Sequence, residues 1–211
     1  MPKTHKESER DLQQVVVTLT ECSNQADVSK LLSRGFSMFL IRADRHNSTE
    51  SKRLIDLLKH AKRVVDQQIA VIVQLDGRQL PRAKVIDSAS LYLYPSSLPL
   101  DLKQQILLVQ SEEVEYVCLQ ATINIESQLA LKSCLVACGA SAELLVRFEA
   151  DASLQQITSL LDVADGALIS AEDFASHNNP LDVGAGHKTI VKLCRQCGTP
   201  VYVCLRAIDQ S

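Results

Sequence analysis

The chain has 211 residues, and 46% of them are hydrophobic, which is enough to bury the core of one sizeable domain. Its 22 Lys and Arg residues against 25 Asp and Glu residues give a formal charge of -3, which argues against nucleic acid as a partner because binding to a phosphate backbone requires excess positive charge. No apolar run is long enough to span a bilayer and residues 1–12 are mostly polar, so the sequence predicts a cytoplasmic protein with no membrane partner.

Seven short runs of hydrophobic and β-branched residues predict seven β-strands. They alternate with longer amphipathic stretches, which is the order expected when crossover helices join parallel strands. The predicted strands begin, in chain order, at Val15, Met38, Ile69, Tyr116, Glu143, Gly166 and Pro200. The predicted helices cover residues 26–35, 48–65, 101–114, 124–139, 153–164 and 186–198.

One long connection, from residue 77 to residue 98, lacks clear periodicity and contains Pro81 and Pro95. The sequence therefore predicts a flexible N-terminal arm over 1–12 and a single domain over 13–211, interrupted by this connection. Seven alternating strands and helices fit either an open doubly wound sheet or a β/α barrel, and periodicity does not choose between them.

Five segments, read in chain order, resemble the catalytic barrel domain of pyruvate kinase. The resemblance covers nearly the whole chain after Leu12, and its strength lies in the order and spacing of the segments. The segments are VVVTLTECSNQADVSKLLSRGFSMFLIRA, AVIVQLD, LPLDLKQQILLVQSEEVEYVCLQAT, ELLVRFEADASLQQITSLLDVADGALISAEDF and KLCRQCGTPVYVCLRAID.

The resemblance implies that the α/β fold is an incomplete TIM-type (β/α) barrel. The family inserts a lid domain after its third strand, where this sequence has only the connection 77–98, and the family continues into an eighth strand and a C-terminal domain. An unclosed barrel would expose unpaired N–H and C=O groups at its strand edges. We therefore expect the chain to form a homo-oligomer or to associate with a related full-length pyruvate kinase, or the N-terminal arm to cover the open edge.

The family transfers a phosphoryl group from phosphoenolpyruvate to ADP in glycolysis, with magnesium and potassium ions. Its KIEN motif supplies a lysine that faces the phosphoryl group and a glutamate that binds Mg²⁺; Arg147 and Glu149 stand at these positions. Asp173 matches the second metal carboxylate, although Glu172 replaces the glycine before it. Hard oxygen ligands suit Mg²⁺, so Glu149 and Asp173 are the candidate divalent-metal ligands. The alternative is that both carboxylates are solvated at strand ends and bind no metal.

Other positions of the family site are substituted. Asp76 matches a potassium-binding aspartate, but Gly77 follows it where the family has threonine, so a potassium site is not expected to be complete. The threonine implicated in delivering a proton to the enolate corresponds to Leu205, which has no proton to donate.

The second-strand motif of the family carries a phosphate-binding arginine and two potassium ligands, and Leu40, Arg42 and Asp44 stand at these positions. Arg42 is on the same side of a strand as Leu40, so it could replace the lost arginine after a shift of register, or it could be a surface residue at a strand end.

Two further motifs carry weak signals. The segment 184–189 resembles a phosphate-binding loop at a predicted helix start, but it lacks the required glycine spacing. Cys194 and Cys197 form a lone CxxC without the second pair that zinc needs, and we interpret them with Cys118, Cys134, Cys138 and Cys204 as reduced packing residues.

The substitutions predict a pyruvate-kinase-like protein that is not an active enzyme and that acts by protein association. The alternative is a phosphotransferase with retained pyruvate kinase activity, or a simpler enzyme that uses Arg147, Glu149 and Asp173 around one Mg²⁺ for enolate chemistry. A third alternative is a gene product with little stable structure of its own.

Overall fold

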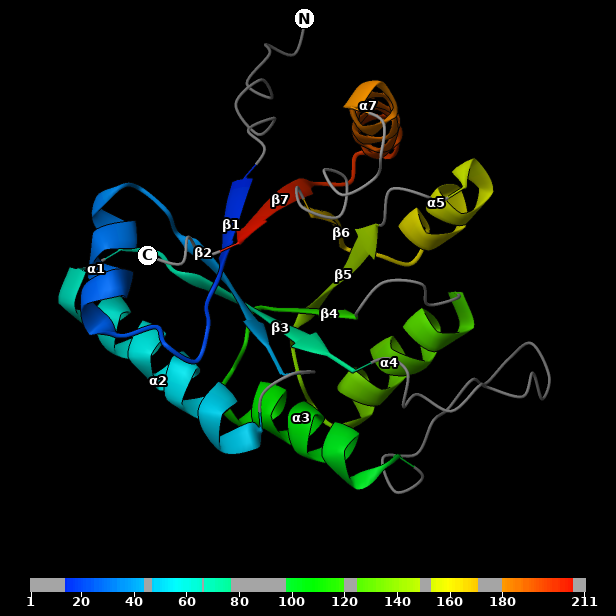
Figure 1. Cartoon of the computed structure of the whole chain (residues 1–211). Helices are drawn as coiled ribbons and strands as arrows, with labels where there is room; N and C mark the ends of the chain where they lie inside the picture. The colour runs from blue at the N-terminus through cyan, green and yellow to red at the C-terminus, as the bar shows by residue number, and fades with distance from the viewer. Residues whose placement is uncertain are drawn as a thin grey trace, which may run out of the picture.

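Seven parallel strands form a barrel, and helices lie around its outside (Figure 1). This computed structural model describes residues 14–43, 47–65, 67–76, 98–119, 125–148, 153–170 and 180–206. The strands are β1 Gln14–Thr18, β2 Met38–Arg42, β3 Ala70–Leu75, β4 Tyr116–Leu119, β5 Glu143–Phe148, β6 Gly166–Ser170 and β7 Val201–Arg206. All seven strands predicted from the sequence are confirmed.

The barrel is closed, with strand order β1-β2-β3-β4-β5-β6-β7. Strand β7 returns to pair with β1 in parallel, from Gln14 opposite Tyr202 to Thr18 opposite Arg206. The α/β barrel of fewer than eight strands is therefore confirmed, but the expectation that the ring stays open is wrong. Because β1 and β7 satisfy each other's backbone groups, no unpaired edge remains between them.

Six helices are described outside the strands: α1 Gln25–Ser33, α2 Ser48–Val65, α3 Leu100–Ser111, α4 Ile125–Ala137, α5 Leu154–Leu161 and α7 Pro180–Cys197. Short side chains fix where two of them begin. The Asn24 side chain accepts from the Asp27 N–H while the Asp27 carboxylate accepts from the Asn24 N–H, and Ser153 and Gln156 make the same reciprocal pair.

Helix α7 begins at Pro180, earlier than the predicted start at residue 186. Proline is favoured in the first turn of a helix, where its missing N–H has no acceptor. The glycine-containing segment 184–189 therefore lies inside the helix, so the prediction that a helix starts there is wrong.

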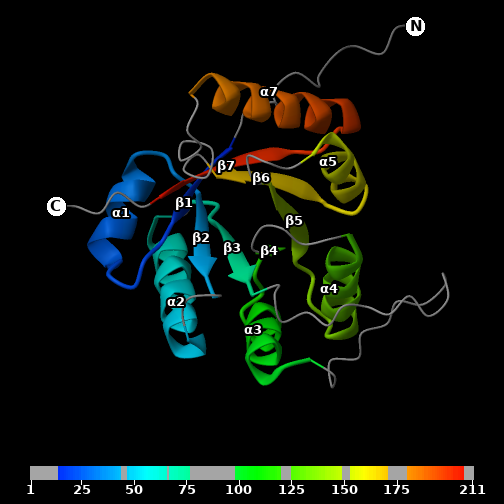
Figure 2. The same cartoon turned by 45° about the vertical axis from the view of Figure 1, so that its right-hand side comes forward.

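Alternating residues divide the hydrophobic core into two layers. Residues that point inward fill the barrel interior: Val16, Met38, Leu40, Ile72, Cys118, Leu145, Leu168, Tyr202 and Cys204. Residues that point outward pack against the helices, as Phe39 and Ile41 of β2 do with Val28 of α1 and Leu54 of α2. Figure 2 shows the helices arranged around the strands.

The predicted arm over 1–12 and most of the connection 77–98 lie outside the described residues, so the predicted division of the chain stays a prediction. None of the described helices is both long enough and apolar enough to cross a membrane.

Candidate functional site

A layer of polar side chains closes the barrel interior at the carboxyl ends of the strands. It consists of the next inward-facing residue after the apolar interior on five strands, and we call it the mouth layer: Thr18, Arg42, Gln74, Arg147 and Ser170. Gln74 is fully buried and Ser170 is 6% exposed, whereas the other three are half-buried. This end of a β/α barrel is the one that carries active and binding sites.

Arg147 is held inside the barrel by Gln74. Its Nη1 atom donates a hydrogen bond of 2.8 Å to Gln74 Oε1, which joins β5 to β3 across the intervening strand β4. A guanidinium that donates to a buried amide oxygen makes a charge-assisted hydrogen bond, about twice as strong as a neutral one. Arg147 therefore helps to hold the carboxyl end of the barrel together.

Arg42 also belongs to the mouth layer. It continues the inward-facing series of Met38 and Leu40, and its Cα is the register partner of Gln74. Arg42 is half-buried at the last position of β2, and with Arg147 it makes two arginines at this end of the barrel. Leu40 lies among the apolar residues of the interior and has no polar role.

The seam between β1 and β7 carries a second polar contact. Thr18 Oγ1 lies 3.2 Å from Cys204 Sγ, and the Cα of Cys204 is the register partner of Ser170 on β6. Sequence reasoning missed Thr18, Gln74 and Ser170 as a group. Each is a single polar residue in or just after an apolar run, and that signal becomes specific only when the strands are placed side by side.

Asp76 follows β3 and is 7% exposed. Its backbone N–H donates to Gln105 Oε1 at 3.2 Å, and Gln105 Nε2 donates to the carbonyl oxygen of Ala43 at 3.1 Å. A side chain from α3 thus links the chain just beyond the ends of β2 and β3. This contact explains how Asp76 is positioned, but it does not make a potassium site.

The predicted divalent-metal ligands Glu149 and Asp173 lie outside the described residues, as does Asp44. Within the described part of the chain no cluster of three His, Cys, Asp or Glu side chains could hold a metal ion. The described residues therefore give no fit for Mg²⁺ by themselves. Glu149 and Asp173 stay predictions.

Leu205 points out of the barrel. Its neighbours Tyr202 and Cys204 belong to the barrel interior, whereas Leu205 has the opposite orientation and is 38% exposed. Leu205 is thus an apolar residue on the outer face of β7.

All seven cysteines are free, and the packing interpretation holds for those that are buried. Burial raises the pKa of Cys134 to about 12, with a further contribution from Cys138, and burial raises the pKa of Cys194 to about 11. Such thiols stay protonated at neutral pH and are poor nucleophiles. Cys197 is exposed, so the packing interpretation is wrong for that residue.

A closed parallel β/α barrel with polar residues at the carboxyl ends of its strands defines the TIM-type architecture. No protein-family model matches the chain, and no curated protein matches its sequence. Among solved structures, the pyruvate kinase from Pyrobaculum aerophilum is similar, with a TM-score of 0.67 and 14% sequence identity. The match covers 91% of this chain and 58% of that enzyme's chain.

At 14% identity this similarity establishes a pyruvate-kinase-like fold and no more. Altogether 361 chains of solved structures match, as expected for an architecture that many unrelated activities share. The fold alone therefore does not determine a function, which depends on the residues of the mouth layer and the surface.

Proposed function

We propose that this chain is a pyruvate-kinase-like barrel that does not transfer phosphoryl groups and that acts by binding another protein. The hydrogen bond of 2.8 Å between Arg147 and Gln74 is the observation that supports the absence of phosphoryl transfer. A lysine ammonium at this position would be a compact charge that can turn toward a phosphoryl group, whereas the planar guanidinium of Arg147 is oriented by its buried partner.

Two further positions support a loss of catalysis. Leu205 stands where the family has a proton donor, and it lies on the outer face of the barrel. Leu40 stands where the family has a phosphate-binding arginine, and it is 1% exposed in the apolar interior. Removing a single well-placed charge donor typically lowers turnover by about 10² to 10³, so several losses together leave little activity.

Binding to another protein cannot use an open strand edge between β1 and β7, because these two strands pair. It is supported instead by the outer face of these two strands, where Val15 is 36% exposed and Leu205 is 38% exposed. Neighbouring exposed apolar side chains on a sheet are typical of surfaces that bind a partner. Candidate partners are a second copy of this chain and a related full-length pyruvate kinase, in the cytoplasm.

The test is pyruvate formation from phosphoenolpyruvate and ADP with Mg²⁺ and K⁺ present, coupled to NADH oxidation by lactate dehydrogenase. Sedimentation velocity on the same sample, alone and with a full-length pyruvate kinase, measures association. We expect no turnover and a complex in at least one of the two sedimentation experiments. Turnover that disappears in Glu149→Gln would show that the chain does transfer phosphoryl groups. A strict monomer that forms no complex would overturn the proposal that it binds another protein.

A second candidate is an enzyme, either a pyruvate kinase or a simpler Mg²⁺-dependent enolate enzyme. The observation that favours it is the pair of arginines, Arg42 and Arg147, in the mouth layer, because two guanidinium groups suit a carboxylate or phosphate. Calorimetry of Mn²⁺ and phosphoenolpyruvate binding distinguishes the candidates. Binding that Glu149→Gln and Asp173→Asn abolish would favour the enzyme.

A further inference from the structure

The outer face of β1 and β7 differs from the outer faces of the other strands. Outward-facing residues of β2 and β3 are covered by helices; Phe39 and Val73, for example, are fully buried. On β1 and β7, by contrast, Val15 and Leu205 are more than one-third exposed and Val203 is partly exposed, although Val17, the register partner of Leu205, is only 4% exposed. Val15 and Val203 are register partners, so these side chains form one continuous apolar strip.

The position of the helices explains this exposure. Helix α1 lies on one side of the β1–β7 seam and α7 on the other, as Figures 1 and 2 both show. Within the described part of the chain, no helix lies over the seam between them. In a β/α barrel, helices form an outer layer over the strands, and the seam is a position in that layer without a described helix.

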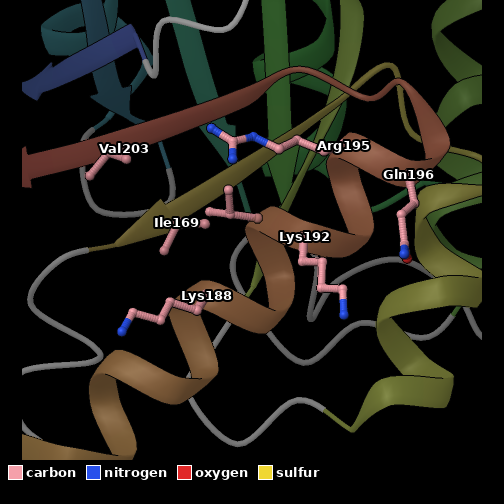
Figure 3. A pocket seen from close by; sticks show the side chains of 7 residues that line it. Ile169, Lys188, Lys192, Arg195, Gln196 and Val203 are labelled. Carbon is pink, nitrogen blue, oxygen red and sulfur yellow. The ribbon is translucent and has the colours of Figure 1, made fainter.

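A groove runs beside the strip, between α7 and strands β6 and β7. Its volume is about 630 Å³, and apolar side chains from both sides line it: Ile169, Val191 and Val203. Figure 3 shows Ile169 and Val203 on the strands and the side chains of α7 across from them. Because Val203 belongs to both features, the groove and the strip form one surface.

The groove is rimmed by positive charge. Lys188, Lys192 and Arg195 line it from α7 and are exposed. Residues at this spacing lie on neighbouring positions of one helix surface. Among the described residues, no carboxylate forms a salt bridge with any of the three, whereas Lys52, Arg53, Lys59, Lys62 and Lys132 each have an acidic partner.

We infer that this surface binds an amphipathic, acidic helix of another protein chain. The inference rests on the proposed function of protein association and specifies the surface and the partner. The apolar face of the helix would cover Val15, Val203 and Leu205. Its carboxylates would face Lys188, Lys192 and Arg195 of α7, which gives charge complementarity across the rim of an apolar contact.

The charges also argue against a second copy of this chain on the same surface. A two-fold dimer whose axis passes through the groove would bring the residues near that axis close to their own counterparts. Lys188, Lys192 and Arg195 of one copy would then face the same cations of the other. Like charges opposed across an interface are unfavourable, so an acidic partner fits this surface better.

The binding probe is a fluorescein-labelled synthetic helix of about 18 residues, roughly 27 Å long, with leucines along one face and glutamates on the flanks. Fluorescence anisotropy of the probe with the full-length chain measures the dissociation constant. The matched probe has lysine in place of every glutamate. We expect the acidic helix to bind, the basic helix not to bind, and added salt to weaken the binding, because the rim charges are exposed.

Two variants test where the acidic helix binds. The triple variant Lys188→Glu, Lys192→Glu, Arg195→Glu should weaken binding by at least about tenfold, and Leu205→Ser should weaken it without changing its salt dependence. The matched control is Lys30→Glu, Arg34→Glu, Arg63→Glu, which makes the same change in net charge on α1, at its C-cap and on α2, at residues that do not line the groove. It should bind within about twofold of the unchanged chain.

No binding of the acidic helix, or equal weakening by the groove variant and its control, would overturn the inference. Binding of the chain to vesicles of phosphatidylserine that the groove variant abolishes, with no binding of the helix, would assign the surface to membranes and also overturn it. Sedimentation separates the two proposals. A chain that forms a complex but does not bind the acidic helix retains the proposed function and loses this surface.

Discussion

The hydrogen bond between Arg147 and Gln74 allows a quantitative test of the mouth layer. Replacing Gln74 with leucine keeps the side-chain volume similar and removes the oxygen that accepts from Arg147 Nη1 at 2.8 Å. Because Gln74 is fully buried, water does not readily replace it as the partner of the guanidinium.

The expected loss follows from the kind of bond. A hydrogen bond to a charged group contributes about 1.5 to 3 kcal/mol, so Gln74→Leu should lower the free energy of unfolding by about 2 kcal/mol. For a protein of this size, that loss corresponds to a decrease in Tm of about 4 to 8 °C.

Urea denaturation followed by far-UV circular dichroism measures the loss, and a double-mutant cycle assigns it to the pair. Arg147→Met alone should also destabilise the chain. The double variant should be more stable than the sum of the single changes predicts, by about 1 to 2 kcal/mol, because neither partner then loses the other.

Strict additivity of the two changes would refute the reasoning. It would mean that Arg147 and Gln74 do not depend on each other, and Arg147 would then be available for a ligand. In that case Arg147→Lys should be tested for phosphoenolpyruvate binding, because the enzyme alternative would gain support.

Three further changes test how other parts of the fold are stabilised. Glu113 follows α3 with a φ of 51°, where the ends of α1, α4 and α7 have glycine, so Glu113→Gly should raise the free energy of unfolding by about 0.5 to 1 kcal/mol in urea titrations. Gly166→Ala would place a methyl group 2.7 Å from Leu145 Cδ2, and this overpacking should lower the melting temperature through a loss of about 1 to 3 kcal/mol. The buried Glu112 carboxylate accepts hydrogen bonds from Lys52 and Lys59, which lower its pKa from the ordinary value of 4.5, and Glu112→Gln should cost about 1 to 2 kcal/mol near neutral pH. Because the lowered pKa stabilises the folded state only while Glu112 is ionised, this difference should shrink as pH falls below about 4, and a difference that grows on acidification would contradict the assignment.

The strands and helices could be predicted from the sequence because their signals are local. The run that begins at Met38 is apolar and β-branched, and Gly35 marks the end of the helix before it. Helix α7 shows the limit of this reasoning. Gly184 and Gly186 suggested a late start, but Pro180 in the first turn and the packing of Ile190 and Cys194 on β6 support a longer helix.

Closure of the barrel and the mouth layer could not be predicted because they depend on pairing between distant segments. Whether Val15 faces Val203 is decided by how all seven strands tilt and stagger, and no local pattern reports it. The resemblance to a family of eight-stranded barrels suggested a missing piece, which led to the wrong expectation of an open ring. Gln74 and Arg147 became recognisable as partners only when β3 and β5 were placed in one barrel.

The pairing of β1 with β7 also determines when the barrel can be completed during synthesis. Strand β1 is made first among the described strands and β7 last, so the ring cannot close until residues 201–206 have left the ribosome. Pairing over such a sequence separation is slow, because the entropy of closing the longest loop must be overcome first. Until then β1 and β6 have free edges that can pair with other chains, so nascent chains stalled before β7 should depend on chaperones for solubility.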